Sequence, residues 1–298
     1  GTALVRWFSQ YNSMVVLDAE TSNSTFAEIF KKAHPDRFFE MYIAEQHMVG
    51  TALGFSVRGY TPFVSTFAAF FSRAFDQIRM SEYSLGNIKF VGSHAGVSIG
   101  EDGASQMGLE DIALFRTLQG SVILYPSDAV STEELVGLAA QREGTVYLRI
   151  TRKDLPLIYT MRDKFRIGGS KTLRSSSKDV VTVAAAGITL HEALVAYDRL
   201  KKQGIVVRVI DLYSIKPLDE KTLKKALAET KALLVVEDHY AQGGIGEAVR
   251  SIFAEHKKPI ISCAVTKIPR SGKPEELLAY EGIDAGAIVK AVKKIIGA

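Results

Sequence analysis

The sequence predicts an α/β fold made of two consecutive domains, each with a mostly parallel sheet flanked by helices. Short runs rich in β-forming residues alternate with amphipathic stretches of helical period along most of the 298 residues. This alternation is lost once, between residues 151 and 178, where a Gly168-Gly169 pair and a run of serines are typical of turns and linkers. We therefore expect one domain over residues 1–165 and a second over residues 166–298.

The first series of elements begins at residues 1–8, which look like the middle of a helix. Runs rich in β-forming residues then predict strands at residues 13–17, 61–63, 87–92 and 121–125. The segments between them carry apolar side chains at helical spacing, and they predict helices at residues 44–57, 68–84, 109–118 and 131–140.

The second series follows the linker and repeats the pattern. Strands are expected at residues 180–184, 206–210, 233–236 and 260–265. Helices are expected at residues 190–203, 220–229, 246–254 and 285–296. Strands separated by helices form parallel sheets, so both series favour the same architecture.

Composition excludes several classes of function. The net charge of +4 comes from Lys and Arg residues scattered among Asp and Glu, so we expect no nucleic-acid partner. No apolar run approaches the roughly 20 residues that cross a bilayer, and no signal peptide is visible, so we expect no membrane partner and a cytoplasmic location. The single cysteine, Cys263, can build neither a disulfide framework nor a cysteine-based metal site.

A glutamate stands where a ligand would be expected. Residues 42–48 read Tyr-Ile-Ala-Glu-Gln-His-Met, so an extended apolar run ends in Glu45 at the start of a predicted helix. Ligands of open α/β sheets bind beyond the carboxyl ends of the strands. A glutamate in the first helical turn is also favoured by the helix dipole, and on position alone that structural interpretation is the stronger one.

Two further stretches carry candidate side chains. Residues 65–75 begin a predicted helix whose aromatic residues, Phe67 and Phe70 among them, share a face and are typical of a core. Residues 92–107 form a long glycine-rich loop after a strand and hold His94, Asp102 and Gln106. Such loops are usually exposed connections, yet loops after parallel strands are also where binding residues gather.

Together these stretches resemble the pyrimidine-binding domain of transketolase, and the resemblance continues to the C-terminus. In the first domain the matching motifs are Asn23-Ser24-Thr25-Phe26, Ile43-Ala44-Glu45-Gln46, residues 65–80, Gly100-Glu101-Asp102-Gly103, Ser105-Gln106-Met107 and Tyr125-Pro126-Ser127-Asp128. In the second they are Val236-Glu237-Asp238-His239, Gly243-Gly244-Ile245-Gly246 and Pro269-Arg270-Ser271-Gly272-Lys273-Pro274. The ordered combination, over essentially the whole chain, is specific to this family.

The resemblance implies that thiamine diphosphate is the cofactor. Glu45 corresponds to the glutamate that hydrogen-bonds the cofactor's aminopyrimidine ring, which lets the exocyclic nitrogen take the proton from thiazolium C2. Phe67 and Phe70 correspond to the aromatic residues that flank the pyrimidine. Arg73 corresponds to a position near that ring, although the role of an ordinary helix-surface arginine stays open.

The resemblance also implies a site for sugar phosphates. Ser24 and Arg152 correspond to residues that hold the substrate's phosphate, where a guanidinium can bind two oxygens at once. His94, Asp102 and Gln106 correspond to residues that face the sugar's hydroxyls and carbonyl, and His94 joins Glu45 as a catalytic residue. Gln106 stands where many bacterial and fungal members have histidine, which favours the animal-type branch. Asp238 and His239 also match, and we interpret them as structural.

The metal half of such a site is missing from this sequence. The family holds Mg2+ and the diphosphate through a Gly-Asp-Gly motif followed by an asparagine, whereas this chain has no Gly-Asp-Gly and its last asparagine is Asn87. We therefore expect Mg2+ or Ca2+ to be bound by a partner half, with thiamine diphosphate shared between the two. The first residue is Gly1 rather than Met, which indicates that the numbering begins inside a longer parent chain.

The resulting prediction is the C-terminal subunit or half of a transketolase of the pentose phosphate pathway. It would transfer a two-carbon ketol unit from a ketose phosphate to an aldose phosphate, would need an N-terminal half, and would self-associate as a dimer within a heterotetramer. One alternative is a deoxyxylulose-phosphate synthase or ketoacid dehydrogenase β-type subunit, since His47 after Glu45-Gln46 is shared with the former. Gln106 and Met107 favour transketolase. A non-catalytic scaffold or regulatory subunit is the alternative of another class.

Overall fold

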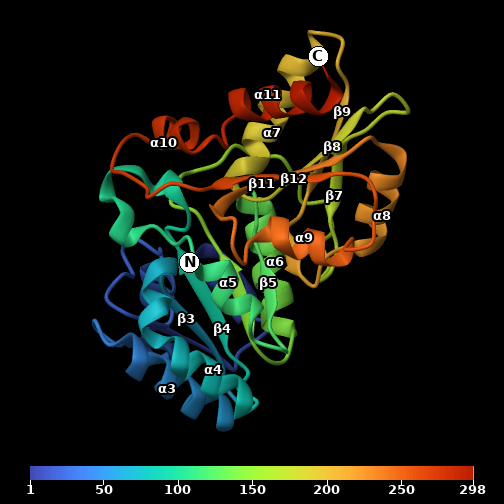
Figure 1. Ribbon diagram of the computed structural model, residues 1–298. Coiled ribbons are helices and arrows are strands. Elements are labelled where there is room, and N and C mark those ends of the chain that lie inside the picture. The colour runs from blue at the N-terminus through green and yellow to red at the C-terminus, as the bar shows by residue number, and fades with distance from the viewer. Residues whose placement is uncertain (298) are drawn as a thin grey trace.

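The computed structural model describes residues 1–297 and confirms the α/β class, with two mostly parallel sheets flanked by helices (Figure 1). The first sheet has seven strands in the order β10-β5-β6-β4-β3-β1-β2, and the second has five in the order β12-β11-β8-β9-β7. In the first sheet only β10 is antiparallel to its neighbour, and in the second only β7 is. None of the helices in this described part is long and apolar enough to cross a membrane.

The first sheet is built from the N-terminal half of the chain and one later strand. Its parallel strands are β1 (Met14–Asp18), β2 (Phe38–Glu40), β3 (Thr61–Phe67), β4 (Lys89–Ser93), β5 (Val122–Leu124) and β6 (Val146–Arg149). Helices on one face are α1 (Thr2–Phe8), α2 (Glu28–Ala33) and α6 (Ala129–Gln141). Helices on the other face are α3 (Glu45–Val57), α4 (Phe75–Tyr83) and α5 (Asp111–Arg116).

Burial on both faces explains why these strands read as continuous apolar runs. In β1, Val15 and Leu17 enter the cluster that contains α3 and α5, whereas Met14 and Val16 enter the cluster that contains α1 and α6. Successive side chains of a strand point to opposite faces, so a strand covered on both sides is apolar throughout.

The second sheet contains β7 (Lys171–Arg174), β8 (Val181–Ala185), β9 (Val207–Asp211), β11 (Leu233–Tyr240) and β12 (Ile260–Val265). Its helices are α7 (Ile188–Lys201), α8 (Glu220–Glu229), α9 (Ile245–Ile252), α10 (Pro274–Glu281) and α11 (Ala285–Ile296). All four strands and all four helices predicted for this half are present, with small differences in their bounds.

Four strands, two helices and one helix type differ from the sequence-based expectation. The helices α2 and α10 were not predicted. The short strands β2, β6 and β7 were not predicted, and β7 lies inside the stretch expected to be a linker. The strand β10 (Ser214–Lys216) was not predicted either. Residues predicted as one helix from 68 to 84 form a 3-10 helix, η2 (Ala68–Ala74), followed by α4.

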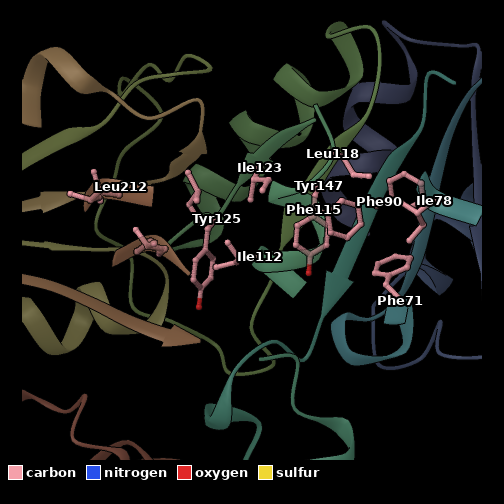
Figure 2. Close-up of a cluster of buried hydrophobic side chains, with 14 of the residues drawn as sticks. Phe71, Ile78, Phe90, Ile112, Phe115, Leu118, Ile123, Tyr125, Tyr147 and Leu212 are labelled. Carbon is pink, nitrogen blue, oxygen red and sulfur yellow. The ribbon is translucent and has the colours of Figure 1, made fainter. Parts of the chain in front are cut away.

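The two sheets share a hydrophobic core. β10 follows β9 of the second sheet along the chain but pairs with β5 at the edge of the first sheet. One buried cluster runs from Phe71 and Phe115 beside the first sheet, through Tyr125, to Leu212 beside the second (Figure 2). The two halves are therefore packed on each other through apolar side chains, and the domain boundary near residue 165 stays a prediction.

Candidate functional site

The predicted site residues follow five strands that are neighbours in the first sheet. In the order of the sheet, Arg152 follows β6, His94 follows β4, Phe67 ends β3, Ser24 follows β1 and Glu45 follows β2. All five strands are parallel, so their carboxyl ends lie at one edge of the sheet. This edge is where open α/β sheets bind ligands, and the missed strands β2 and β6 complete it.

Backbone strain gathers at the same edge. Of the five non-glycine residues with positive φ in the described chain, Glu20 and Phe26 lie in the loop after β1, Tyr42 lies after β2, and His94 lies after β4. The fifth, Leu85, lies elsewhere. A left-handed conformation costs a non-glycine residue roughly 1–2 kcal/mol, and such strain tends to cluster where function requires a fixed geometry.

Glu45 opens α3 and is only 3% exposed. The backbone reaches it through Tyr42, whose φ is 51°, so the chain turns sharply between β2 and the helix. The Arg73 guanidinium in η2 lies 3.4 Å from its carboxylate (Nη1 to Oε2) and is itself largely exposed. A buried carboxylate with one long ionic contact is able to accept a hydrogen bond from a ligand.

Flat rings are stacked where β3 and β4 end. The Phe67 ring lies 3.8 Å from the His94 ring at an angle of 10°, and 5.2 Å from the Phe70 ring at 15°. Phe67 and His94 are buried, whereas Phe70 is half-buried. The arrangement presents ring faces to a planar ligand.

His94 is held as a neutral imidazole. Burial lowers the pKa of His94 to about 4, the nearby Arg152 charge acts in the same direction, and Asp102 opposes it. Its Nδ1 lies 3.0 Å from the Ser93 hydroxyl oxygen. A neutral ring fixed in this way has one nitrogen to donate and one to accept, which suits contact with the hydroxyl or carbonyl of a sugar.

Arg152 and Asp102 form an ion pair. Arg152 Nη1 donates to Asp102 Oδ2 at 3.0 Å and to the Ile99 carbonyl at 3.3 Å. Half of the Arg152 side chain is exposed, and it lines a cavity of about 700 Å3 together with Lys153, Arg6 and other residues. The cavity is also lined by Asp128, Asp154 and Glu133, the last of which pairs with Arg6, so Arg152 and Lys153 are the cationic groups that an anion would meet there.

Ser24 and Gln106 are less tightly placed. Ser24 is half-buried in the loop after β1, and its N–H donates to the Thr21 carbonyl at 2.8 Å. Gln106 is half-buried at the end of the short 3-10 helix η4 (Ala104–Gln106). Within residues 1–297, no hydrogen bond or ion pair joins the side chain of either residue to the other predicted site residues.

Asp18, which was not predicted as a site residue, organises the loop that carries Ser24. Asp18 ends β1, is fully buried, and accepts hydrogen bonds from Thr21 N at 2.6 Å, Thr21 Oγ1 at 3.0 Å and Thr25 Oγ1 at 2.8 Å. Burial raises the pKa of Asp18 to about 6 against these hydrogen bonds. An aspartate at a strand end with threonines three and seven residues later is the local signal that could have revealed it.

The described residues form no cluster of three or more His, Cys, Asp or Glu that could hold a metal ion. Two of the carboxylates at this edge, Glu45 and Asp102, have arginine partners.

Family comparisons match both halves of the chain. A family model described as the transketolase pyrimidine-binding domain matches residues 1–157, and one described as the transketolase C-terminal domain matches residues 170–288. The chain is 54% identical to mouse transketolase-like protein 2 and 52% identical to human transketolase, each over 99% of this chain and 48% of the relative. It thus spans about half the length of these curated relatives.

Solved structures give the same match. A structure described as a split-gene transketolase in an inactive beta4 tetramer superposes with a TM-score of 0.90 at 38% identity, covering 99% of this chain and 96% of that one. A transketolase from Pichia stipitis in complex with sedoheptulose 7-phosphate superposes with a TM-score of 0.81 at 20% identity, covering 99% of this chain and 44% of that one. The second likeness concerns the fold alone.

Proposed function

Because this chain belongs to the transketolase family, we propose that it is the C-terminal subunit or half of a thiamine diphosphate-dependent transketolase. Its proposed activity is the transfer of a two-carbon ketol unit from a ketose phosphate to an aldose phosphate. One observation carries the proposal. The buried carboxylate of Glu45 and the stacked rings of Phe67 and Phe70 stand at the ligand edge of a pyrimidine-binding domain.

The residues fit the pyrimidine part of the cofactor. Glu45 would accept a hydrogen bond from the aminopyrimidine, and Phe67 and Phe70 would pack against its flat ring. Thiamine diphosphate, when bound, supplies the nucleophilic carbon that carries the two-carbon unit. The part of this chain is to fix the ring, to hold a proton at the ring nitrogen through Glu45, and to cover the site with apolar surface.

The substrate side is assigned to residues at the same edge of the sheet, of which Arg152 lines the cavity. His94, being neutral, would donate and accept hydrogen bonds at the sugar's oxygens, and Gln106 would add an amide. Arg152 and Ser24 would hold the phosphate at the far end of the sugar. Asp102 would orient both the sugar and Arg152, because it already pairs with that guanidinium.

A partner half completes the proposal. The relatives are about twice as long as this chain, and the matching split-gene chain is described as inactive in its own tetramer. We therefore assign Mg2+ or Ca2+ and the diphosphate to an N-terminal subunit or domain, and we expect two copies of this chain within a heterotetramer. A cytoplasmic location and a place in the pentose phosphate pathway belong to the same proposal.

The test is ketol transfer from xylulose 5-phosphate to ribose 5-phosphate with thiamine diphosphate and Mg2+. We expect turnover when the chain is mixed with a diphosphate-binding N-terminal half and none from the chain alone. Pyruvate as donor serves as a second arm, because synthase or dehydrogenase subunits decarboxylate a 2-oxo acid. Turnover with pyruvate only, or no turnover in any mixture, would overturn the proposal.

A matched pair of variants tests the assigned mechanism. Glu45→Gln removes the carboxylate but keeps its shape, so activity in the mixture should fall more than about 100-fold with little change in thermal stability. Glu101→Gln, at an exposed glutamate near the same edge, is the control and should stay close to wild type. Retained activity in Glu45→Gln would show that the proton is held elsewhere.

A further inference from the structure

The glycine-rich loop, residues 94–108, carries three of the proposed substrate residues, His94, Asp102 and Gln106. It leaves the end of β4 and returns ahead of α5, with the 3-10 helices η3 (Val97–Asp102) and η4 inside it. Its two ends are joined, since Ala95 and Gly108 form an isolated β-bridge and Gly96 N donates to the Gly108 carbonyl at 2.8 Å. The loop is therefore a closed unit whose position depends on what its body contacts.

The body of the loop is buried in the other half of the chain. Val97, Ile99 and Met107 belong to the core cluster of the second sheet, which also contains Val236 of β11 and Leu277 of α10. At Gly103, with φ 83°, a Cβ would lie 2.6 Å from the Ser271 hydroxyl oxygen just before α10. A loop that begins and ends at the first sheet is thus packed against the second.

Asp238 makes the polar contact to this loop. It lies on β11, is fully buried, and its Oδ1 accepts a hydrogen bond from Val97 N at 2.8 Å. Gly96 approaches the same carboxylate so closely that a Cβ there would lie 2.0 Å from Asp238 Oδ2, and its φ of 84° also favours glycine. The loop backbone and this carboxylate are fitted to each other.

Arg149 links the loop to Asp238. Its fully buried guanidinium donates through Nη2 to the Gly108 carbonyl at 2.9 Å and to the Asp238 carbonyl at 2.8 Å. Its Nε donates to Asp111 Oδ2 at 2.7 Å. Three residues later Arg152 contacts the loop at Ile99 and Asp102. A shift of the loop would move both the sugar contacts and the phosphate contact.

We infer that Asp238, in the half of the chain that carries no proposed chemistry, is a positioning residue for the sugar phosphate. By accepting the Val97 N–H it fixes the loop that carries His94 and Asp102. This inference rests on the proposed function only for its kinetic consequence. The placement of the loop itself is a property of this chain and can be measured without a partner.

The first measurement is hydrogen–deuterium exchange of the full chain alone. Asp238→Ala removes the acceptor, and Gly96→Ala displaces the loop from the other side of the same contact. Both should increase exchange of the amides of residues 97–108 by about tenfold, the size expected when a buried N–H loses its hydrogen-bond acceptor. Asp238→Asn keeps a carbonyl oxygen that can accept from Val97, so it should leave exchange near the wild-type rate.

The matched control is Glu237→Ala on the same strand. Glu237 is equally buried, but it accepts hydrogen bonds from Ile245 N and, at 2.9 Å, from Gly246 N, at the start of α9. Its loss should increase exchange around residues 245–250 and leave residues 97–108 unchanged. Comparing the two variants separates a specific effect on the loop from general destabilisation of the second sheet.

The second measurement is steady-state kinetics of each variant mixed with the N-terminal half. In Asp238→Ala the KM for the ketose phosphate should rise about tenfold, while the half-saturating concentration of thiamine diphosphate should change much less. Asp238→Asn should have a KM close to that of the wild type. An inactive wild-type mixture would refute the proposed function and leave the exchange result to decide the inference. Unchanged exchange at residues 97–108 in both Asp238→Ala and Gly96→Ala would overturn the inference that Asp238 positions this loop.

Discussion

At the scale of single residues, the neutral imidazole of His94 has a consequence for stability. Its pKa is lowered to about 4 from the ordinary value of 6.5, chiefly by burial. As the pH falls below 6.5 an unfolded chain takes up this proton while the folded chain does not. The contribution of His94 to stability is therefore fully present above pH 6.5 and is lost as the pH falls toward about 4.

We expect the His94 ring signals in an NMR titration to stay constant between pH 8 and about 5.5, since the ring remains neutral there. The urea-unfolded chain is the control, and its histidine signals should move through the ordinary range. A His94 midpoint near 6.5 in the folded chain would contradict the burial argument. His239 offers an internal comparison, because burial lowers its pKa to about 4 as well.

At the scale of elements, Asp128 joins a helix to the segment that follows the first sheet. It is the N-cap of α6 and accepts from Ser131 N at 2.7 Å through Oδ1. Its Oδ2 accepts from Ile158 N at 2.8 Å and Tyr159 N at 2.9 Å. One carboxylate therefore satisfies backbone donors of two separate parts of the chain.

Asp128→Ala should lower the free energy of unfolding by about 2–4 kcal/mol, because a cap and two further hydrogen bonds to a buried charge are lost together. Asp284→Ala is the matched control. Asp284 caps α11 through Ala287 N alone, at 2.9 Å, so its loss should cost about 1 kcal/mol. Urea denaturation of both variants measures the two losses of unfolding free energy. Equal losses would show that the hydrogen bonds of Asp128 to Ile158 and Tyr159 contribute nothing to stability.

Elements with a local signal were predictable, and elements fixed by distant partners were not. Continuous apolar runs such as Val15 to Leu17 predict a buried strand wherever they occur. By contrast, β6 ends in Arg149, whose charge is tolerated in the core only because Asp111 lies 2.7 Å away. β10 exists only because β5 offers a free edge, and three residues carry no periodic signal.

The candidate site likewise contains residues that the sequence predicts and residues whose role appears only in the structure. Glu45, Phe67, Phe70 and His94 were predicted from their family motifs, and the structure brings the last three together. Asp18 and Asp238 were not assigned a role at the site, because each acts through backbone N–H groups that a sequence does not display. Roles made by tertiary hydrogen bonds appear only once the fold is known.

At the scale of the whole molecule, the shared core predicts that the two halves unfold together. The cluster that contains Phe71 and Phe115 of the first half also contains Leu212 and Leu233 of the second. Trp7, the single tryptophan, lies in α1 and reports on the first half alone, whereas far-UV circular dichroism reports on all helices. Coincident transitions by the two probes are the mark of one cooperative unit.

Leu212→Ala tests this coupling from the second half. Removal of this fully buried side chain should lower the free energy of unfolding by about 2–4 kcal/mol. The transition seen by Trp7 fluorescence should then shift as far as the transition seen by circular dichroism. Ile268→Ala, at a side chain that is 85% exposed, is the control and should shift neither. A Trp7 transition that stays in place in Leu212→Ala would mean that the halves are independent.

The edge strands of the seven-stranded sheet affect how this chain associates with its own copies at high concentration. Both outermost strands, β10 and β2, are three residues long, and they carry Lys216 and Glu40. Short, charged edge strands offer few backbone groups to which a strand of another copy could pair, and this disfavours amyloid-like growth from the sheet. Packing of one chain on another through this sheet must then rely on side-chain surfaces rather than on a continuation of its β-ladder.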